Sequence, residues 1–136
     1  MVFWFSGNKL CFTHKGTNAC REVVFPIEQP IFSVYHRPLE NLIFVSLFDT
    51  EHHLSNQPNN VFAVDDRTGK IVWRINEDEK TRFPHFRNRP IMKYMYFAEN
   101  EINGKACVYD VYYQVAWEIN SETGCIERFI PESGFK

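Results

Sequence analysis

The stretch VFAVDDRTGKIVWRI, Val61 to Ile75, contains the pattern that decides the fold. An apolar run over Val61 to Val64 is followed by the turn formers DDRTG and then by KIVWRI, in which apolar and polar residues alternate. Gly69 stands where a short connection needs a left-handed residue, and Asp65 or Asp66 can accept hydrogen bonds from the amides of the turn. The stretch therefore predicts a β-hairpin.

A degenerate second copy of this pattern, VAWEINSETGCIERFI, occupies Val115 to Ile130. Asn120 is equivalent to Asp65, and Gly124 is equivalent to Gly69, because both pairs are separated by the same 55 residues (120 − 65 and 124 − 69). Because one offset relates the turn and the strands on both sides of it, we predict a sheet-building unit that is used twice. Replacement of either glycine by valine is expected to cost about 1 kcal/mol or more, since a β-branched residue resists a positive φ.

The residues upstream of each hairpin add two further apolar runs to each unit. The two runs are separated by RPLEN in the first unit and by ENEINGK in the second. No stretch of the chain shows the spacing of apolar residues that is typical of an amphipathic helix. The expected strands of unit one are Ile31–His36, Leu42–Phe48, Asn60–Asp65 and Lys70–Ile75, and those of unit two are Ile91–Glu99, Ala106–Tyr113, Val115–Asn120 and Cys125–Ile130.

The sequence thus predicts an all-β protein with antiparallel four-stranded sheets in tandem. We expect a single domain over residues 1–136, with N-terminal strands in 1–27, repeat unit one in 30–76 and repeat unit two in 85–131. Within their sheets, the second strands of the two units are expected to be inner strands.

The run NVFAVDDRTGKIVWRI, with its Thr-Gly turn and its tryptophan in the outgoing strand, resembles the blade repeat of quinoprotein-like β-propellers. The resemblance covers roughly three quarters of the chain and implies blade-like sheets. In the quinone-dependent dehydrogenases that share this blade, the cofactor and metal lie on the axis of a closed ring, and closure takes about 4–8 blades. Because this chain has strands for two blades and part of a third, we expect a sandwich or a partly open barrel without a cofactor.

Composition narrows the class of protein further. Among the 136 residues, 44% are hydrophobic and 16% aromatic, which indicates a folded chain, and the net charge of −2 disfavours nucleic acid and anionic membranes as partners. The N-terminus does not resemble a signal peptide, and no apolar run is long enough to cross a bilayer. We expect a cytoplasmic protein whose four cysteines are free thiols.

Two polar segments could carry function. DTEHHLSNQPNN is the longest polar connection, and INEDEKTRFPHFRNRP has the sharpest contrast of charge in the chain. We predict that both contact a partner, with no metal bound, through Asp49, Glu51, His52, His53, Glu77, Asp78 and Glu79.

Several histidine and cysteine residues are also candidate catalytic residues or metal ligands. Adjacent histidines on an extended chain point to opposite faces, which weakens a metal or acid–base role for His52 and His53. His36 and His85 hold comparable places in the two units, but two histidines alone are a weak catalytic signal. A further set of residues at the N-terminus lacks the fourth ligand of a structural zinc site: Cys11, His14 and Cys20.

Three hypotheses for function follow. In general character, as a small, slightly acidic chain without catalytic motifs, the protein resembles the immunity proteins of bacterial toxin systems such as contact-dependent growth inhibition. That resemblance implies a non-enzymatic protein that binds a basic toxin, such as a nuclease, as a monomer or small homo-oligomer. The alternatives are a structural or oligomeric propeller-like module and a histidine-dependent enzyme.

Overall fold

The computed structural model describes residues 1–13, 19–48, 60–75, 94–110 and 115–130, which form three antiparallel sheets in chain order. The N-terminal sheet consists of β1 (Val2–Ser6), β2 (Lys9–Thr13) and β3 (Cys20–Val24). The middle sheet consists of β4 (Ile31–Arg37), β5 (Leu42–Leu47), β6 (Val61–Asp65) and β7 (Ile71–Arg74). The C-terminal sheet consists of β8 (Tyr94–Glu99), β9 (Ala106–Asp110), β10 (Val115–Ile119) and β11 (Ile126–Ile130).

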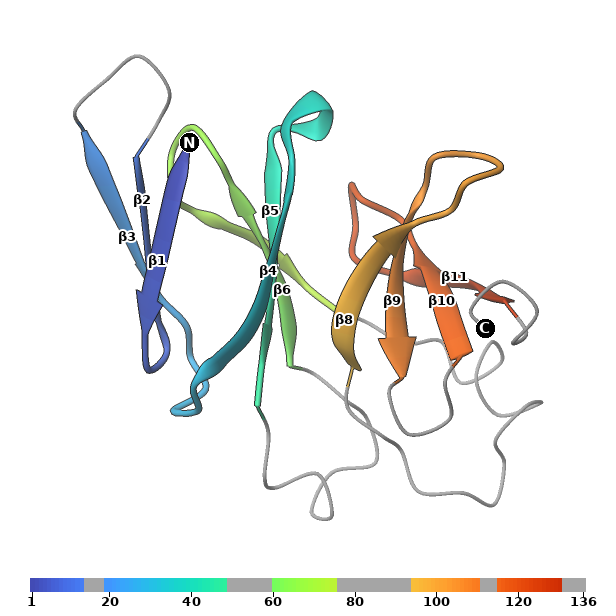
Figure 1. Cartoon of the computed structure of the whole chain (residues 1–136), viewed down its shortest axis with the longest axis horizontal. Coiled ribbons are helices and arrows are strands. Elements are labelled where there is room, and N and C mark those ends of the chain that lie inside the picture. The colour runs from blue at the N-terminus through green and yellow to red at the C-terminus, as the bar shows by residue number, and fades with distance from the viewer. Residues whose placement is uncertain (14–18, 49–59, 76–93, 111–114, 131–136) are drawn as a thin grey trace.

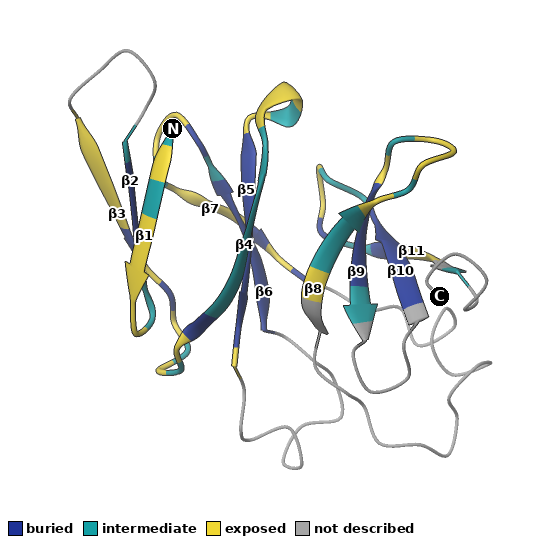
Figure 2. Ribbon diagram, in the orientation of Figure 1, coloured by how far each residue is buried: buried dark blue, intermediate teal, exposed yellow. Residues whose placement is uncertain are grey.

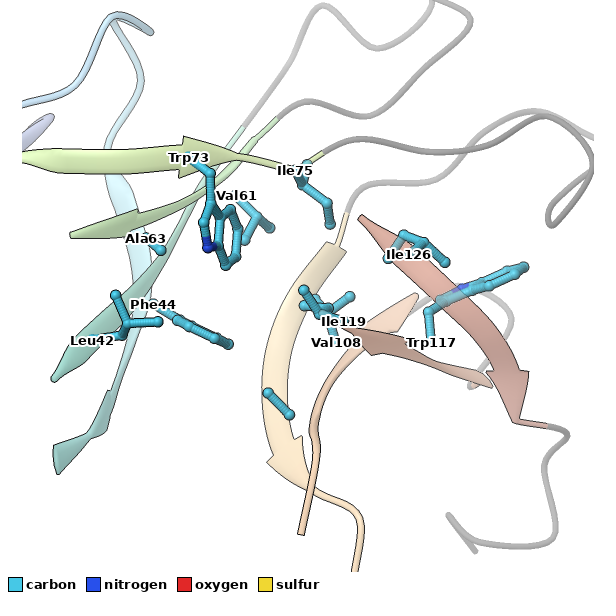
Figure 3. Close-up of a cluster of buried hydrophobic side chains, with 11 residues drawn as sticks. Leu42, Phe44, Val61, Ala63, Trp73, Ile75, Val108, Trp117, Ile119 and Ile126 are labelled. Atoms are coloured by element: carbon cyan, nitrogen blue, oxygen red, sulfur yellow. The ribbon is translucent and has the colours of Figure 1, made fainter. Parts of the chain in front are cut away.

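The three sheets stand side by side along the longest axis of the molecule, with the middle sheet between the other two (Figure 1). One apolar core fills the space between the N-terminal and middle sheets and includes Phe12, Phe25 and Phe62. A second core fills the space between the middle and C-terminal sheets, where Phe44 and Trp73 lie opposite Val108 and Ile119 (Figure 3). The fold is therefore a stack of sheets that are joined through their faces.

Strand β5 explains why the middle sheet lies in the centre. Its sequence LIFVSL is buried at every position, and successive side chains alternate between the two cores, so that Leu42 and Phe44 face one core while Ile43 and Val45 face the other. A continuous apolar run is what a strand needs when both faces of its sheet are covered. Figure 2 shows β5 and β6 buried between less buried outer elements.

The turns of the two repeated hairpins agree hydrogen bond for hydrogen bond. The carboxylate of Asp65 accepts from the amides of Arg67 and Thr68 at 2.8 and 3.2 Å. In the second hairpin, Asn120 Oδ1 accepts from the amides of the two equivalent residues, Glu122 and Thr123, at 2.9 and 3.3 Å.

The glycines of these turns agree equally closely. Gly69 and Gly124 have φ angles of 76° and 77°, and each amide donates to the backbone oxygen of the Asp or Asn at the start of its turn. The 55-residue repeat in the sequence thus corresponds to a repeat in local structure.

The β8–β9 hairpin contains a third copy of this turn, at a position where the sequence predicts only a break between strands. Asn100 Oδ1 accepts from the amide of Ile102 at 2.9 Å, and Gly104 has a φ of 74° and donates to the Asn100 carbonyl at 2.7 Å. An Asp or Asn followed four residues later by Gly is the signal common to all three turns.

The predicted fold class is confirmed, because the described residues form antiparallel sheets in tandem, two of them four-stranded, and contain no α-helix. The break at RPLEN is a short 3-10 helix, η1 (Pro38–Glu40), which ends in a left-handed residue at Asn41. The turn acceptor is Asp65, whereas Asp66 is buried and contacts His36.

The propeller resemblance stays a prediction. Within the described ranges, no helix has the length and apolar character needed to cross a bilayer.

Asp65 should make folding sensitive to acid. Burial raises the pKa of its carboxyl group, but the hydrogen bonds from the Arg67 and Thr68 amides outweigh that effect, and the net pKa is lowered. A lowered folded-state pKa contributes stability above the unfolded value of about 3.9, and this contribution is lost as the pH falls through the folded value.

Replacement of this aspartate by asparagine tests the pKa argument, since asparagine is the natural residue in the second turn. We expect Asp65→Asn to lower the free energy of unfolding by less than about 1 kcal/mol at pH 7 and by progressively less below pH of about 4. Urea unfolding between pH 7 and pH 2 measures the difference. A difference that does not change with pH would show that the charge of Asp65 does not contribute.

Candidate protein-binding surface

Three aromatic rings lie together where the middle and C-terminal sheets meet. Phe32 on β4 packs edge-on against Phe48, which follows β5, at a centroid distance of 4.8 Å, and against Tyr96 on β8 at 5.0 Å. The exposed fractions of Phe48 and Tyr96 are 39% and 49%. We call these three residues the aromatic patch. Large aromatic side chains that stay half exposed on rigid strands are typical of protein interfaces.

Irregular strand pairing accompanies the aromatic patch. The register between β4 and β5 shifts between Ile31 and Ser33, so that Phe32 is the extra residue of a bulge, and β8 shows a comparable shift between Tyr94 and Tyr96. A bulge bends its strand and re-aims the side chains beside it. The amide of Phe48 donates to the Pro30 carbonyl at 2.8 Å, which holds that residue beside the start of β4.

Each predicted polar segment contains an acidic stretch, residues 49–53 in the first and 76–80 in the second, and we call these two stretches the acidic segments. They continue from one end of the middle sheet, since Phe48 directly precedes the first and Ile75 directly precedes the second. The amide of Leu47 donates to Asn60, and the amide of Ile75 donates to Val61, both at 2.9 Å, so these strand ends are neighbours. The predicted contact residues themselves lie outside the described residues: Asp49, Glu51, His52, His53, Glu77, Asp78 and Glu79.

Of the four histidines considered as catalytic candidates, the structure describes His36. The other three, His52, His53 and His85, lie outside the described residues. His36 Nε2 lies 2.9 Å from the buried Asp66 carboxylate, and its ring packs edge-on against Phe3 at 5.4 Å. The His36–Asp66 pair therefore joins the middle sheet to the N-terminal sheet beside the core between them, so its contacts stabilise the fold.

Potential metal ligands do not gather in the part of the chain that the structure describes. Cys11 and Cys20 lie on neighbouring strands, β2 and β3, whereas His14 lies outside the described residues. No group of three or more His, Cys, Asp or Glu side chains within the described ranges could hold a metal ion. The four cysteines are free thiols.

A polar cleft of about 430 Å³ lies at the other end of the strands from the aromatic patch, between η1 and the two turns of the C-terminal sheet. Arg37 closes its inner side by donating to Tyr35 Oη at 3.2 Å and to the Gly104 carbonyl at 2.8 Å, and it also pairs with Glu40. The guanidinium thus ties the middle sheet to the C-terminal sheet, so its charge is already used inside the protein.

Glu118 is a second buried charge, with a side chain that is 3% exposed. Its carboxylate accepts hydrogen bonds from Asn100 Nδ2 at 3.2 Å and Asn103 Nδ2 at 3.3 Å and pairs with Arg128. It therefore anchors the β8–β9 turn to β10. Beside it, burial and the charge of Glu118 raise the pKa of the Cys107 thiol to about 11, which keeps that thiol protonated and unreactive near neutral pH.

The aromatic patch could not be predicted from the sequence, because aromatic residues in strands usually belong to the core. The one signal available was the position of Phe48, between an apolar run and a polar connection. No protein-family model, curated protein or solved structure matches this chain.

Proposed function

We propose that this chain is a non-enzymatic protein-binding protein whose working surface is the aromatic patch together with the two acidic segments that continue from the same end of the middle sheet. One observation carries the proposal: Phe48, at the end of the middle sheet from which both acidic segments continue, and Tyr96 of the neighbouring β8 are half exposed on either side of Phe32. Binding energy at protein interfaces concentrates in aromatic anchors, and surrounding charges select the partner and speed association.

The charge of these segments favours a basic partner. Asp49 and Glu51 stand in the first segment, and Glu77, Asp78 and Glu79 stand in the second, in a chain whose net charge is −2. A basic toxin, such as a nuclease, has the complementary charge, and an inhibitor that covers its active site needs no chemistry of its own. We therefore propose an immunity protein that acts in the cytoplasm against a cognate toxin.

The described charged groups that are buried or half-buried support this assignment, because they hold the fold together. The Asp66 carboxylate contacts His36, Arg37 pairs with Glu40 and the Gly104 carbonyl, and Glu118 contacts two asparagines and an arginine. Groups used in this way stabilise the arrangement of the sheets.

A charge reversal tests the proposal. We expect Glu77, Asp78 and Glu79 changed together to Lys to slow association with the product of the neighbouring gene by about tenfold at low salt and to weaken protection in cells, because steering depends on charge. Surface plasmon resonance across a range of salt concentrations measures the association rate constant.

The matched control makes the same change of charge at the two turns of the C-terminal sheet. Glu99, Glu101 and Glu122 are exposed, and their reversal to Lys should leave the association rate within about twofold of the wild-type value, apart from the salt-dependent effect of net charge. Equal slowing by the two triple variants would remove the acidic segment from the interface.

A further inference from the structure

The outer face of the N-terminal sheet, which faces away from the middle sheet, carries exposed apolar side chains at one end of the stack. Alternation along β1 places Phe3 against the core and Val2 and Trp4 on the outer face, where their exposed fractions are 62% and 45%. Strand pairing places Cys11, which is itself buried, and Glu22 in the row of Trp4, and Lys9 and Val24 in the neighbouring row. Val24 is 63% exposed.

The sequence of β1 is unusual for a strand with one solvated face. In VFWFS, four successive apolar residues leave no polar alternation, as in LIFVSL of β5 and VFAVD of β6. Those two strands lie in a sheet that is covered on both faces, whereas β1 is exposed along most of its length and half-buried only at Phe3 (Figure 2). A strand of this composition is suited to burial on both faces.

The charges on the outer face indicate what covers it. Among the residues of β1, β2 and β3, Lys9 and Glu22, with side chains 45% and 59% exposed, are the two charged residues of this face, so these strands give it no net charge and it contains its own complement. A basic toxin would gain little there. A two-fold axis can run diagonally across this face, through the position of Cys11. It places each Lys9 opposite Glu22 of the other copy. The strands of the two copies then cross at roughly 90°, which is one of the two common classes of sheet packing.

We propose that the outer face of the N-terminal sheet binds the same face of a second copy of this chain. Three strands of five residues cover roughly 14 by 17 Å, because neighbouring strands lie about 4.8 Å apart and each residue rises about 3.4 Å. Such an interface is smaller than the standard class of stable complexes, so the dimer is weak and forms at high micromolar concentration. The inference goes beyond partner binding and does not depend on it.

Sedimentation equilibrium of the full chain from about 10 µM to 1 mM tests the proposal. Trp4→Lys should raise the dissociation constant of the dimer by at least tenfold. Val72→Lys is the matched control, since Val72 on β7 is 48% exposed but lies outside this face, and it should leave the constant unchanged. A wild-type chain that remains monomeric at 1 mM would overturn the proposal, as would equal effects of the two variants.

A mixing experiment separates contacts between copies from the Lys9–Glu22 pair within one chain, whose atoms lie 3.6 Å apart. Lys9→Glu and Glu22→Lys, each alone, should raise the dissociation constant about tenfold, because like charges then meet across the interface. An equimolar mixture of the two variants restores both opposite-charge pairs between copies while each chain still lacks its internal pair. Recovery of wild-type affinity in the mixture is expected, and no recovery would contradict the proposed geometry. Thermal unfolding confirms that each variant is folded.

Discussion

Gly124→Ala should lower the free energy of unfolding by about 3 kcal/mol or more, which makes Gly124 one of the most sensitive positions in the protein. A Cβ atom on Gly124 would lie 2.5 Å from Cε3 of Trp73. The indole cannot withdraw, since it is buried against Phe44 and donates from Nε1 to the Ser121 carbonyl at 2.7 Å. The positive φ adds its own cost of about 1–2 kcal/mol for any L residue, on top of the overpacking.

The equivalent glycine of the first hairpin provides the matched control. Gly69 has the same φ within 1°, yet the nearest atom to an added Cβ is Arg21 Cβ at an ordinary 3.4 Å, so Gly69→Ala should cost only about 1–2 kcal/mol. Urea unfolding of both variants measures the difference. Trp73→Leu should remove most of the excess cost of Gly124→Ala in a double-mutant cycle. Equal costs in the wild-type background would show that the Trp73 contact is absent.

The second large effect concerns Glu118. Glu118→Ala should lower the free energy of unfolding by about 3 kcal/mol, because it leaves Asn100, Asn103 and Arg128 without the carboxylate that joins them. Glu118→Gln should cost less, since the amide oxygen still accepts a hydrogen bond.

An exposed neighbour provides the comparison for Glu118. Glu122 is exposed in the β10–β11 turn, and Glu122→Ala should change the free energy of unfolding by less than about 0.5 kcal/mol. Urea unfolding at neutral pH measures all three variants. A cost for Glu118→Ala as small as that for Glu122→Ala would mean that the buried carboxylate does not anchor the β8–β9 turn.

Local chemistry explains what could be predicted from the sequence. The strands and the turns at Asp65 and Asn120 depend on residues within a few positions of one another, through alternation, side-chain acceptors and a left-handed glycine. The expected strands accordingly agree with the structure to within a residue at most of the ends that it describes. The third turn at Asn100 uses the same chemistry and was missed only because its flanking strands do not repeat the sequence of the other two.

The contacts between sheets could not be predicted in the same way. Trp73 meets Ser121 across 48 positions, and Arg37 meets Gly104 across 67. The aromatic patch likewise depends on a bulge at Phe32 and on the approach of β8 to β4. Nothing in the local pattern of either strand distinguishes a half-exposed ring from a buried one, because both occupy apolar positions in a strand.

The most direct test of the proposed binding surface compares exposed apolar residues at the two ends of the strands. The wild-type chain and two double variants are immobilised, used to capture a partner from a lysate of the source organism, and then titrated with the purified partner. Phe48→Ala with Tyr96→Ala should weaken binding about a hundredfold, as expected for the loss of two aromatic anchors. Leu39→Ala with Ile102→Ala, at positions 99% and 95% exposed near the polar cleft, should leave the affinity unchanged. Unchanged affinity in the Phe48 and Tyr96 variant, or loss of binding in the Leu39 and Ile102 variant, would contradict the account.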